Sequence, residues 1–129
     1  MKTYLLDSDI LIDYFRKRNE AVELVESLGR EGELAISILS ITELRAGWSD
    51  KEAKIYLTRL YDIAKVVSIS QKIAEQAGKY RQDFSKKGII LHSIDAIIGT
   101  TAISHNYWLV TRNKKDFPMS EIALYQDIY

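Results

Sequence analysis

Residues 4–13, YLLDSDILID, change character at Asp7, and this change sets the expected fold. Residues 2–6 are β-compatible, and a run of this length without alternation is typical of a strand buried on both faces. From Ser8 onward the apolar residues follow helical spacing, and Ser8 or Asp9 can cap the helix that begins there. We therefore expect Asp7 at the carboxyl end of a parallel strand, which is where open α/β sheets bind ligands.

The rest of the chain repeats this alternation of short apolar runs and amphipathic segments. Further strands are expected at 34–37, 66–69 and 107–111, with a weak edge strand at 121–125. Helices are expected at 19–28, from Ser37 or Ser40 to Gly47, from Ser49 or Asp50 to 63, at 71–85 and at 94–105. The pattern predicts a single domain over residues 1–129, an α/β sandwich with one parallel sheet and helices on both faces.

Composition limits the chemistry that the chain can carry. The sequence has no cysteine, which excludes disulfides and thiolate metal sites and leaves oxygen or histidine ligands, the oxygen set being suited to Mg²⁺ or Mn²⁺. Eighteen basic and eighteen acidic residues cancel, so net charge neither indicates nor excludes a nucleic-acid partner. We see no leader and no apolar run of roughly 20 residues, and expect a cytoplasmic protein with no membrane contact.

Four acids follow strands or open the helices after them: Asp7, Glu43, Asp95 and Asp116. One parallel sheet would bring all four to the same edge. Two unit charges about 4 Å apart at an effective dielectric near 20 repel by roughly 4 kcal/mol, so the group needs separation, protonation or a cation. A divalent metal answers this requirement, and a water molecule on it can attack phosphorus.

Each acid also has a purely structural interpretation. In this interpretation Asp7 is a helix cap and nothing more, and Asp95 only compensates the dipole of its helix. Glu43 alone is typical of a solvated helix acid and Asp116 of a charged loop. Asp9 is a competing ligand, whereas Asp13, His92 and His105 are interpreted as surface, capping or structural residues.

Taken together, four segments resemble the PIN-domain ribonucleases, particularly the VapC-type toxins of toxin–antitoxin pairs. They are LLDSDILID at 5–13, SITELRAG at 40–47, IDAIIGTTA at 94–102 and LVTRNKKDF at 109–117. The resemblance implies a Rossmann-like three-layer α/β/α sandwich. It further implies a Mg²⁺- or Mn²⁺-dependent endoribonuclease that cleaves RNA, is inhibited by a cognate antitoxin protein and forms a homodimer.

The resemblance also assigns the site residue by residue. Asp7, Glu43 and Asp95 match the three core acids of the family. In many members the fourth acid stands at the position of Asn113, and in others at that of Asp116. We take Asp116 as a catalytic metal or water ligand. The supporting residues are then Ser8, as the small hydroxyl beside the metal, with Thr111 and Asn113, which shape the site through hydrogen bonds.

A nuclease also needs positive groups to hold phosphates. The candidates are the local basic clusters 16–18, 86–87 and 112–115, the last of which adjoins Asp116. Each cluster taken separately is equally typical of a solvated face.

Two other functions compete. A haloacid-dehalogenase-like phosphotransferase pairs two aspartates after its first strand, as Asp7 and Asp9 are paired here, but Ile10-Leu11 replaces the Gly-Thr that should follow. The other is a non-catalytic binding module that uses the region of Trp48, Tyr56 and Tyr61.

Overall fold

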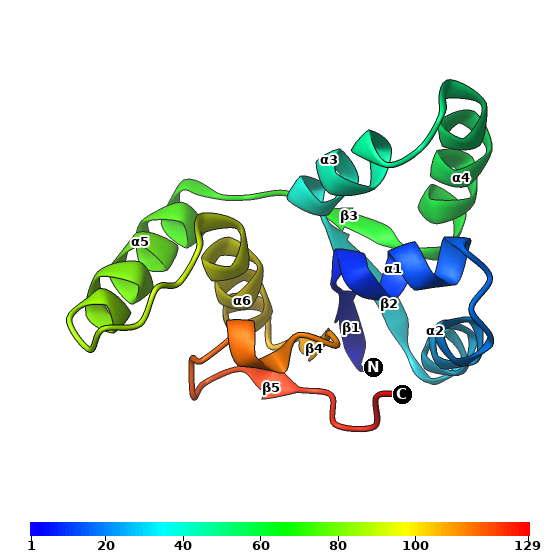
Figure 1. Ribbon diagram of the computed structural model, residues 1–129. Coiled ribbons are helices and arrows are strands. Elements are labelled where there is room, and N and C mark those ends of the chain that lie inside the picture. Colours follow the sequence, from blue (N-terminus) through cyan, green and yellow to red (C-terminus); the bar gives the residue numbers. More distant parts are fainter.

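A five-stranded sheet in which every neighbouring pair is parallel forms the centre of the molecule (Figure 1). The computed structural model describes residues 1–129, and the strand order is β3-β2-β1-β4-β5. The strands are β1 (Thr3–Leu6), β2 (Glu33–Ser37), β3 (Lys65–Val67), β4 (Trp108–Val110) and β5 (Ala123–Leu124). The predicted parallel sheet is thus confirmed, and the weak pattern at 121–125 contributes only a two-residue edge strand.

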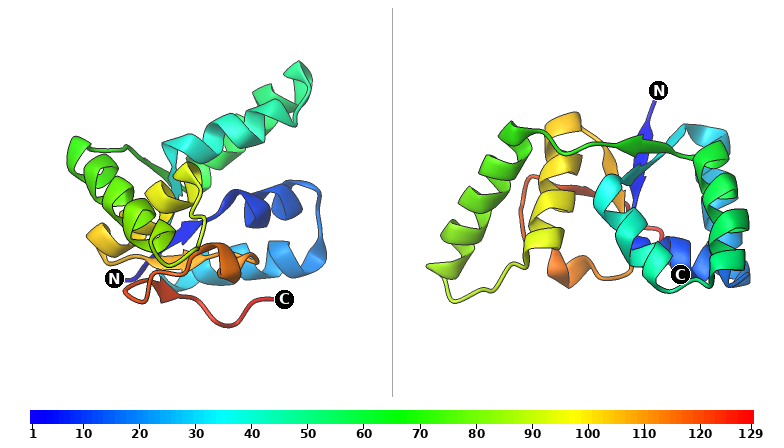
Figure 2. Two further views of the ribbon diagram at one scale, coloured as in Figure 1. Left: turned by 60° about the vertical axis from the view of Figure 1, so that its left-hand side comes forward. Right: turned by 90° about the horizontal axis from the view of Figure 1, so that it is seen from above.

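Helices cover both faces of this sheet (Figure 2). They are α1 (Ser8–Phe15), α2 (Asn19–Glu31), α3 (Ile38–Ala46), α4 (Asp50–Ile63), α5 (Gln71–Ser85) and α6 (Ser93–His105), followed by the 3₁₀ turn η1 (Lys114–Asp116). Tyr4 and Leu6 of β1 pack in one core with α1, α2, α3 and α4, whereas Leu5 packs in a second core with α5 and α6. This alternation, with both faces covered, is what the run of apolar residues in β1 predicts, and it confirms the three-layer α/β/α sandwich.

The path of the chain puts the topological switch point of the sheet at the carboxyl ends of β1 and β4. After β1 the chain adds β2 and then β3 on one side, and α5 and α6 then carry it back to β4 on the other side of β1. Ligands bind at such a switch point in open α/β sheets. Asp7 lies there, and its backbone N–H donates to the carbonyl oxygen of Val110 at 2.9 Å.

Two helix starts differ from the expected ones. Asp7 itself is the N-cap of α1, in place of Ser8 or Asp9, because its carboxylate accepts from the Ser8 N–H. Helix α6 begins at Ser93, one residue before the expected start, and its N-cap is His92. Among the alternatives offered for α3 and α4, the caps are Ser37 and Ser49, and Ser70 caps α5 in the same way, each side chain accepting from a backbone N–H in the first turn of its helix.

Helix α2 is also longer than expected. It continues through Gly29 to Glu31 and ends only at Gly32. Its apolar stripe of Ala21, Leu24, Val25 and Leu28 is buried against the sheet, and this packing outweighs the low helix propensity of one glycine. None of the helices combines the length and the apolar character that crossing a bilayer requires.

The backbone approaches itself closely at Gly32, where α2 turns into β2. A Cβ at Gly32 would collide with the carbonyl oxygen of Lys2, which also accepts from the Glu33 N–H at 2.9 Å to begin the pairing of β1 with β2. We predict that Gly32→Ala lowers the free energy of unfolding by about 1–3 kcal/mol, because backbone rather than a flexible side chain must move.

The matched control is Gly78→Ala in α5, where a Cβ meets no atom within 4 Å. This variant should be stabilised by about 0.5–1 kcal/mol through higher helix propensity. Urea unfolding followed by circular dichroism measures both, and an equal effect of the two substitutions would contradict the close approach at Gly32.

Candidate active site

Asp7 is a buried carboxylate without a cationic partner. Its side chain accepts from the Ser8 N–H at 2.9 Å and from the Thr111 hydroxyl at 2.8 Å, and the residue is 7% exposed. Ser8 and Thr111, the residues that supply these donors, are buried as well. No lysine, arginine or histidine forms an ion pair with Asp7. Its charge is therefore held by two neutral donors alone.

This environment raises the pKa of Asp7 to about 7. Burial is the largest cause, because it penalises the charged form, and the negative charge of Asp9 adds to it. The hydrogen bonds from Thr111 and Ser8 act in the opposite direction, and Asp95 contributes a smaller increase. A strongly shifted carboxyl at a sheet switch point is typical of a functional site.

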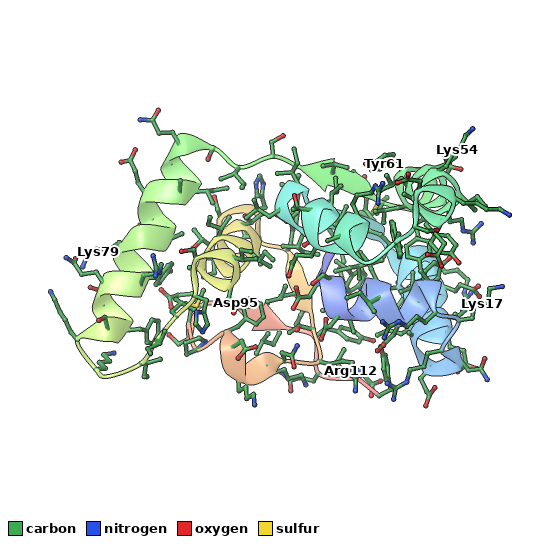
Figure 3. The ribbon with its side chains drawn as sticks, turned by 45° about the horizontal axis from the view of Figure 1, so that its top comes forward. Lys17, Lys54, Tyr61, Lys79, Asp95 and Arg112 are labelled. Carbon is green, nitrogen blue, oxygen red and sulfur yellow. The ribbon has the colours of Figure 1, made fainter.

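The other three predicted acids lie around the same edge. Glu43 is an exposed residue of α3, Asp95 is half-buried in the first turn of α6, and Asp116 is exposed in η1. Figure 3 shows Asp95 at the start of α6. Burial raises the pKa of Asp95, and the charges of Asp116 and Glu43 raise it further. The four acids thus act on one another electrostatically, and none of them is in an ion pair.

They do not form an assembled coordination shell in this structure. No three acidic or histidine side chains come close enough together to hold one metal ion. The parallel sheet therefore brings the predicted acids to one edge but leaves Glu43 and Asp116 exposed. Their assignment as metal ligands stays a prediction.

Both oxygens of Asp9 accept hydrogen bonds from other parts of the chain. Its Oδ1 accepts from the Ile10 N–H at 2.8 Å, and its Oδ2 accepts from the Arg112 N–H at 2.9 Å and from the Asn113 amide at 3.3 Å. Asp9 thereby joins the start of α1 to the loop after β4, and its charge acts on Asp7 from there. Asn113 also donates its N–H to the Thr111 hydroxyl at 3.0 Å, so the predicted supporting residues are joined to one another.

A groove of about 370 Å³ begins beside Glu43. Its walls come from the end of α1, from α3 and from the start of α4, and they include Phe15, Trp48 and Tyr56. These rings pack mutually with centroids 5.0–5.2 Å apart. The surplus of apolar residues in α4 is thus partly used inside the domain, and Ile55 and Tyr61 remain exposed.

The expected basic rim is only partly free. Arg18 and Arg112, from two of the three basic clusters, meet at the carboxylate of Asp13, at 3.6 and 2.9 Å. From the sequence we interpreted Asp13 as a surface or capping residue and did not predict its contacts with Arg18 and Arg112. No local signal could have indicated it, because Asp13 and Arg112 are 99 residues apart.

The comparisons with known proteins agree with this architecture. Residues 4–123 match the PIN domain family. The chain is 35% identical over 113 residues to Ribonuclease VapC1 of Methanocaldococcus jannaschii, which covers 88% of this chain and 77% of that protein. It is 30% identical over 123 residues to Ribonuclease VapC2 of Rickettsia felis, covering 88% and 89%.

Solved structures give the same result. The fold is similar to that of VapBC2 from Rickettsia felis bound to a DNA fragment from their promoter, with a TM-score of 0.83, 25% identity, and 95% and 97% of the two chains covered. A toxin–antitoxin complex from Klebsiella pneumoniae matches with a TM-score of 0.70 and 35% identity, covering 92% and 94%. The fold, the position of Asp7 and these matches together show that the chain belongs to the PIN-domain family.

Proposed function

We propose that this protein is a divalent-metal-dependent endoribonuclease and the toxin of a type II toxin–antitoxin pair. The observation that carries the proposal is the buried carboxylate of Asp7, which has no cationic partner and lies at the sheet switch point. The chain also aligns along 88% of its length with proteins named Ribonuclease VapC. The PIN-domain match favours a nuclease over the phosphotransferase alternative, and so do the hydrogen bonds that Asp9 accepts from the loop after β4.

Asp7, Glu43, Asp95 and Asp116 would hold Mg²⁺ or Mn²⁺. The donor set fits such a cation because all four groups offer carboxylate oxygens, the ligands that hard divalent ions prefer. Since Glu43 and Asp116 are exposed and unpaired, both can rotate inward once a cation removes the mutual repulsion. When bound, the cation supplies a water of lowered pKa and charge stabilisation for the phosphodiester.

Ser8, Thr111 and Asn113 hold the Asp7 carboxylate in place. The Thr111 hydroxyl and the Ser8 N–H occupy one lone pair on each oxygen of Asp7, and so fix its plane and leave the other lone pairs free. Asn113 in turn holds the Thr111 hydroxyl through its N–H. These contacts orient Asp7 before any ligand arrives, which reduces the reorganisation that binding would require.

The partners follow from the solved relatives, several of which are toxin–antitoxin complexes. We extend this partnership to the chain and assign an antitoxin segment to the groove of Phe15, Trp48 and Tyr56, because an occupant there would cover Glu43. A homodimer is supported by Ile38 and Ile94, which are 44% and 41% exposed at the starts of α3 and α6. The proposed RNA substrate and antitoxin partner support a cytoplasmic location for this activity.

The first prediction concerns Asp7→Asn. Purified protein should cut single-stranded or structured RNA with Mn²⁺ and not with EDTA, and Asp7→Asn should lower the rate about 100-fold or more, because one carboxylate of the cation site is lost. Asp62→Asn, an exposed acid at the end of α4, is the matched control and should cut RNA normally. Gel electrophoresis of labelled RNA measures cleavage by the wild type, by Asp7→Asn and by Asp62→Asn.

Equal cleavage by the wild type and Asp7→Asn would contradict the assignment of the site, and a phosphoenzyme on Asp7 would favour the phosphotransferase. Expression of the wild type should also arrest growth. If the protein cuts RNA and leaves growth unchanged, the nuclease assignment stands and the toxin assignment fails.

The second prediction concerns pH and follows from the raised pKa of Asp7. Between about pH 4 and 7 the folded protein keeps the Asp7 proton while the unfolded chain releases it, so this group's contribution to stability falls as pH rises through that window. In EDTA, the wild type should lose on the order of 2 kcal/mol relative to Asp7→Asn between pH 5 and pH 8.

Urea unfolding at the two pH values measures this difference. Mn²⁺ should restore the stability of the wild type at pH 8, since it binds the ionised carboxylate, and should leave Asp7→Asn much less affected. A difference between the two proteins that does not change with pH would show that Asp7 titrates normally.

A further inference from the structure

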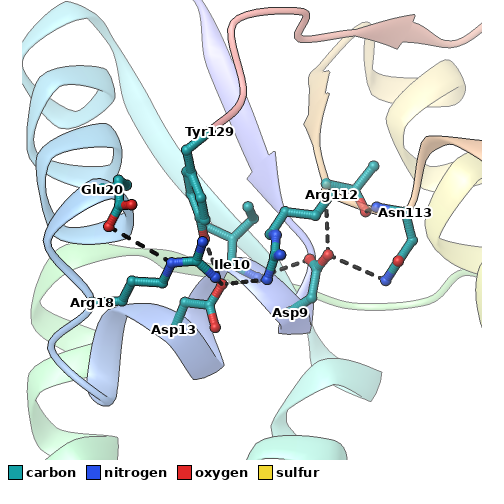
Figure 4. A network of polar contacts seen from close by, with 9 residues as sticks. Asp9, Ile10, Asp13, Arg18, Glu20, Arg112, Asn113 and Tyr129 are labelled. Atoms are coloured by element: carbon teal, nitrogen blue, oxygen red, sulfur yellow. Dashed lines mark hydrogen bonds and ion pairs between the residues drawn. The ribbon is translucent and has the colours of Figure 1, made fainter.

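Tyr129, the last residue of the sequence, lies between two arginines beside the candidate active site (Figure 4). The Arg18 guanidinium stands 4.8 Å and the Arg112 guanidinium 5.3 Å from the centroid of its ring. The Tyr129 hydroxyl donates to Oδ2 of Asp13 at 2.7 Å, the same oxygen that accepts from Arg112 at 2.9 Å. We name these four residues, Asp13, Arg18, Arg112 and Tyr129, the tyrosine clamp.

Both positive groups of the tyrosine clamp are paired with carboxylates. Asp13 faces both guanidiniums, its side chain is only 13% exposed, and Arg18 also lies 3.7 Å from Glu20. Burial and the hydrogen bond to Asp13 raise the pKa of Tyr129, so its hydroxyl remains a proton donor at neutral pH. With its positive groups paired and its aromatic ring in place, the clamp is built to hold chain segments together rather than to capture a free phosphate.

The segment that it holds is the loop after β4. The side chain of Arg112 is bound by Asp13, while the backbone N–H of the same residue donates to Asp9. The next residue, Asn113, donates to Asp9 from its side chain and to the Thr111 hydroxyl from its backbone. The Thr111 hydroxyl donates to Asp7. A continuous series of hydrogen bonds, each 2.7–3.3 Å long, therefore runs from Tyr129 to the buried carboxylate.

We infer that Tyr129 and Asp13 are positioning residues for the reaction proposed above: they fix the loop of residues 111–113 so that the Thr111 hydroxyl orients Asp7. This inference rests on the proposed function for its effect on cleavage, although the coupling to the loop can be measured without any activity. Within this series, Thr111 is the residue that hydrogen-bonds to the Asp7 carboxylate, and the clamp therefore acts on the orientation of that carboxylate.

The test uses Tyr129→Phe, which keeps the ring between the arginines and removes only the hydroxyl. Tyr80→Phe is the matched control, because the Tyr80 hydroxyl also donates to a carboxylate, Glu121, at 2.8 Å, but from α5. Two quantities are measured in both variants: the amide hydrogen exchange of Arg112 and Asn113 by NMR, and kcat and KM for RNA cleavage with Mn²⁺.

We expect amide exchange at Arg112 and Asn113 to become about three- to tenfold faster in Tyr129→Phe, the consequence of losing one hydrogen bond in the series. kcat should fall by a similar factor while KM for RNA stays unchanged. Tyr80→Phe should change neither quantity, although its global stability should fall comparably. Asp13→Asn, which removes the charge that holds Arg112, should have the larger effect on both.

Unchanged exchange at Arg112 and Asn113 in Tyr129→Phe overturns the inference, and so does a rise in kcat, which would mean that Tyr129 shields the site. A higher KM with unchanged kcat also overturns it, because the clamp would then contact RNA. If the wild type does not cut RNA, the proposed function fails, and the exchange rates still decide whether the clamp controls the loop.

Discussion

The carboxylate of Asp7 is the group on which the candidate site depends. It caps α1, it joins the ends of β1 and β4 through its backbone and its contact with Thr111, and it does so while buried. Burying a carboxylate that has only neutral donors is unfavourable, and the nearby charges of Asp9 and Asp95 make ionisation more unfavourable still. A divalent cation is the simplest partner that would relieve this penalty, which is why a metal-dependent reaction fits this edge of the sheet.

The fold supports this arrangement from both faces. The two cores hold β1 rigidly between α1–α4 and α5–α6, so Asp7 emerges from a strand that cannot easily shift. Local violations of ordinary packing rules, here a buried acid among like charges, are expected at functional sites and are supported by stability elsewhere. Asp7 is buried and fixed by its hydrogen bonds, whereas the side chains of Glu43 and Asp116 are exposed and free to change rotamer.

The position of Asp7 and the starts of several helices could be predicted from the sequence. The change from an unalternating apolar run to helical spacing located Asp7 at a strand end, and the serine caps located α3 and α4. The contacts that hold the loop after β4 could not be predicted. Tyr129 reaches Asp13 across 116 residues, and no periodicity or capping pattern encodes such a pairing. The role of Asp9 was likewise hidden, because its partner is the backbone N–H of Arg112, which is independent of residue type.

We propose that the acids around Asp7 complete a divalent-cation site. A crystal soaked in Mn²⁺ and measured for anomalous scattering tests this directly. We expect an anomalous peak at about 2.0–2.3 Å from a carboxylate oxygen of Asp7, with Asp95 and at least one of Glu43 and Asp116 turned toward it. A protein that binds Mn²⁺ elsewhere, or one whose Asp7 carboxylate stays without a cation at saturating Mn²⁺, would contradict it.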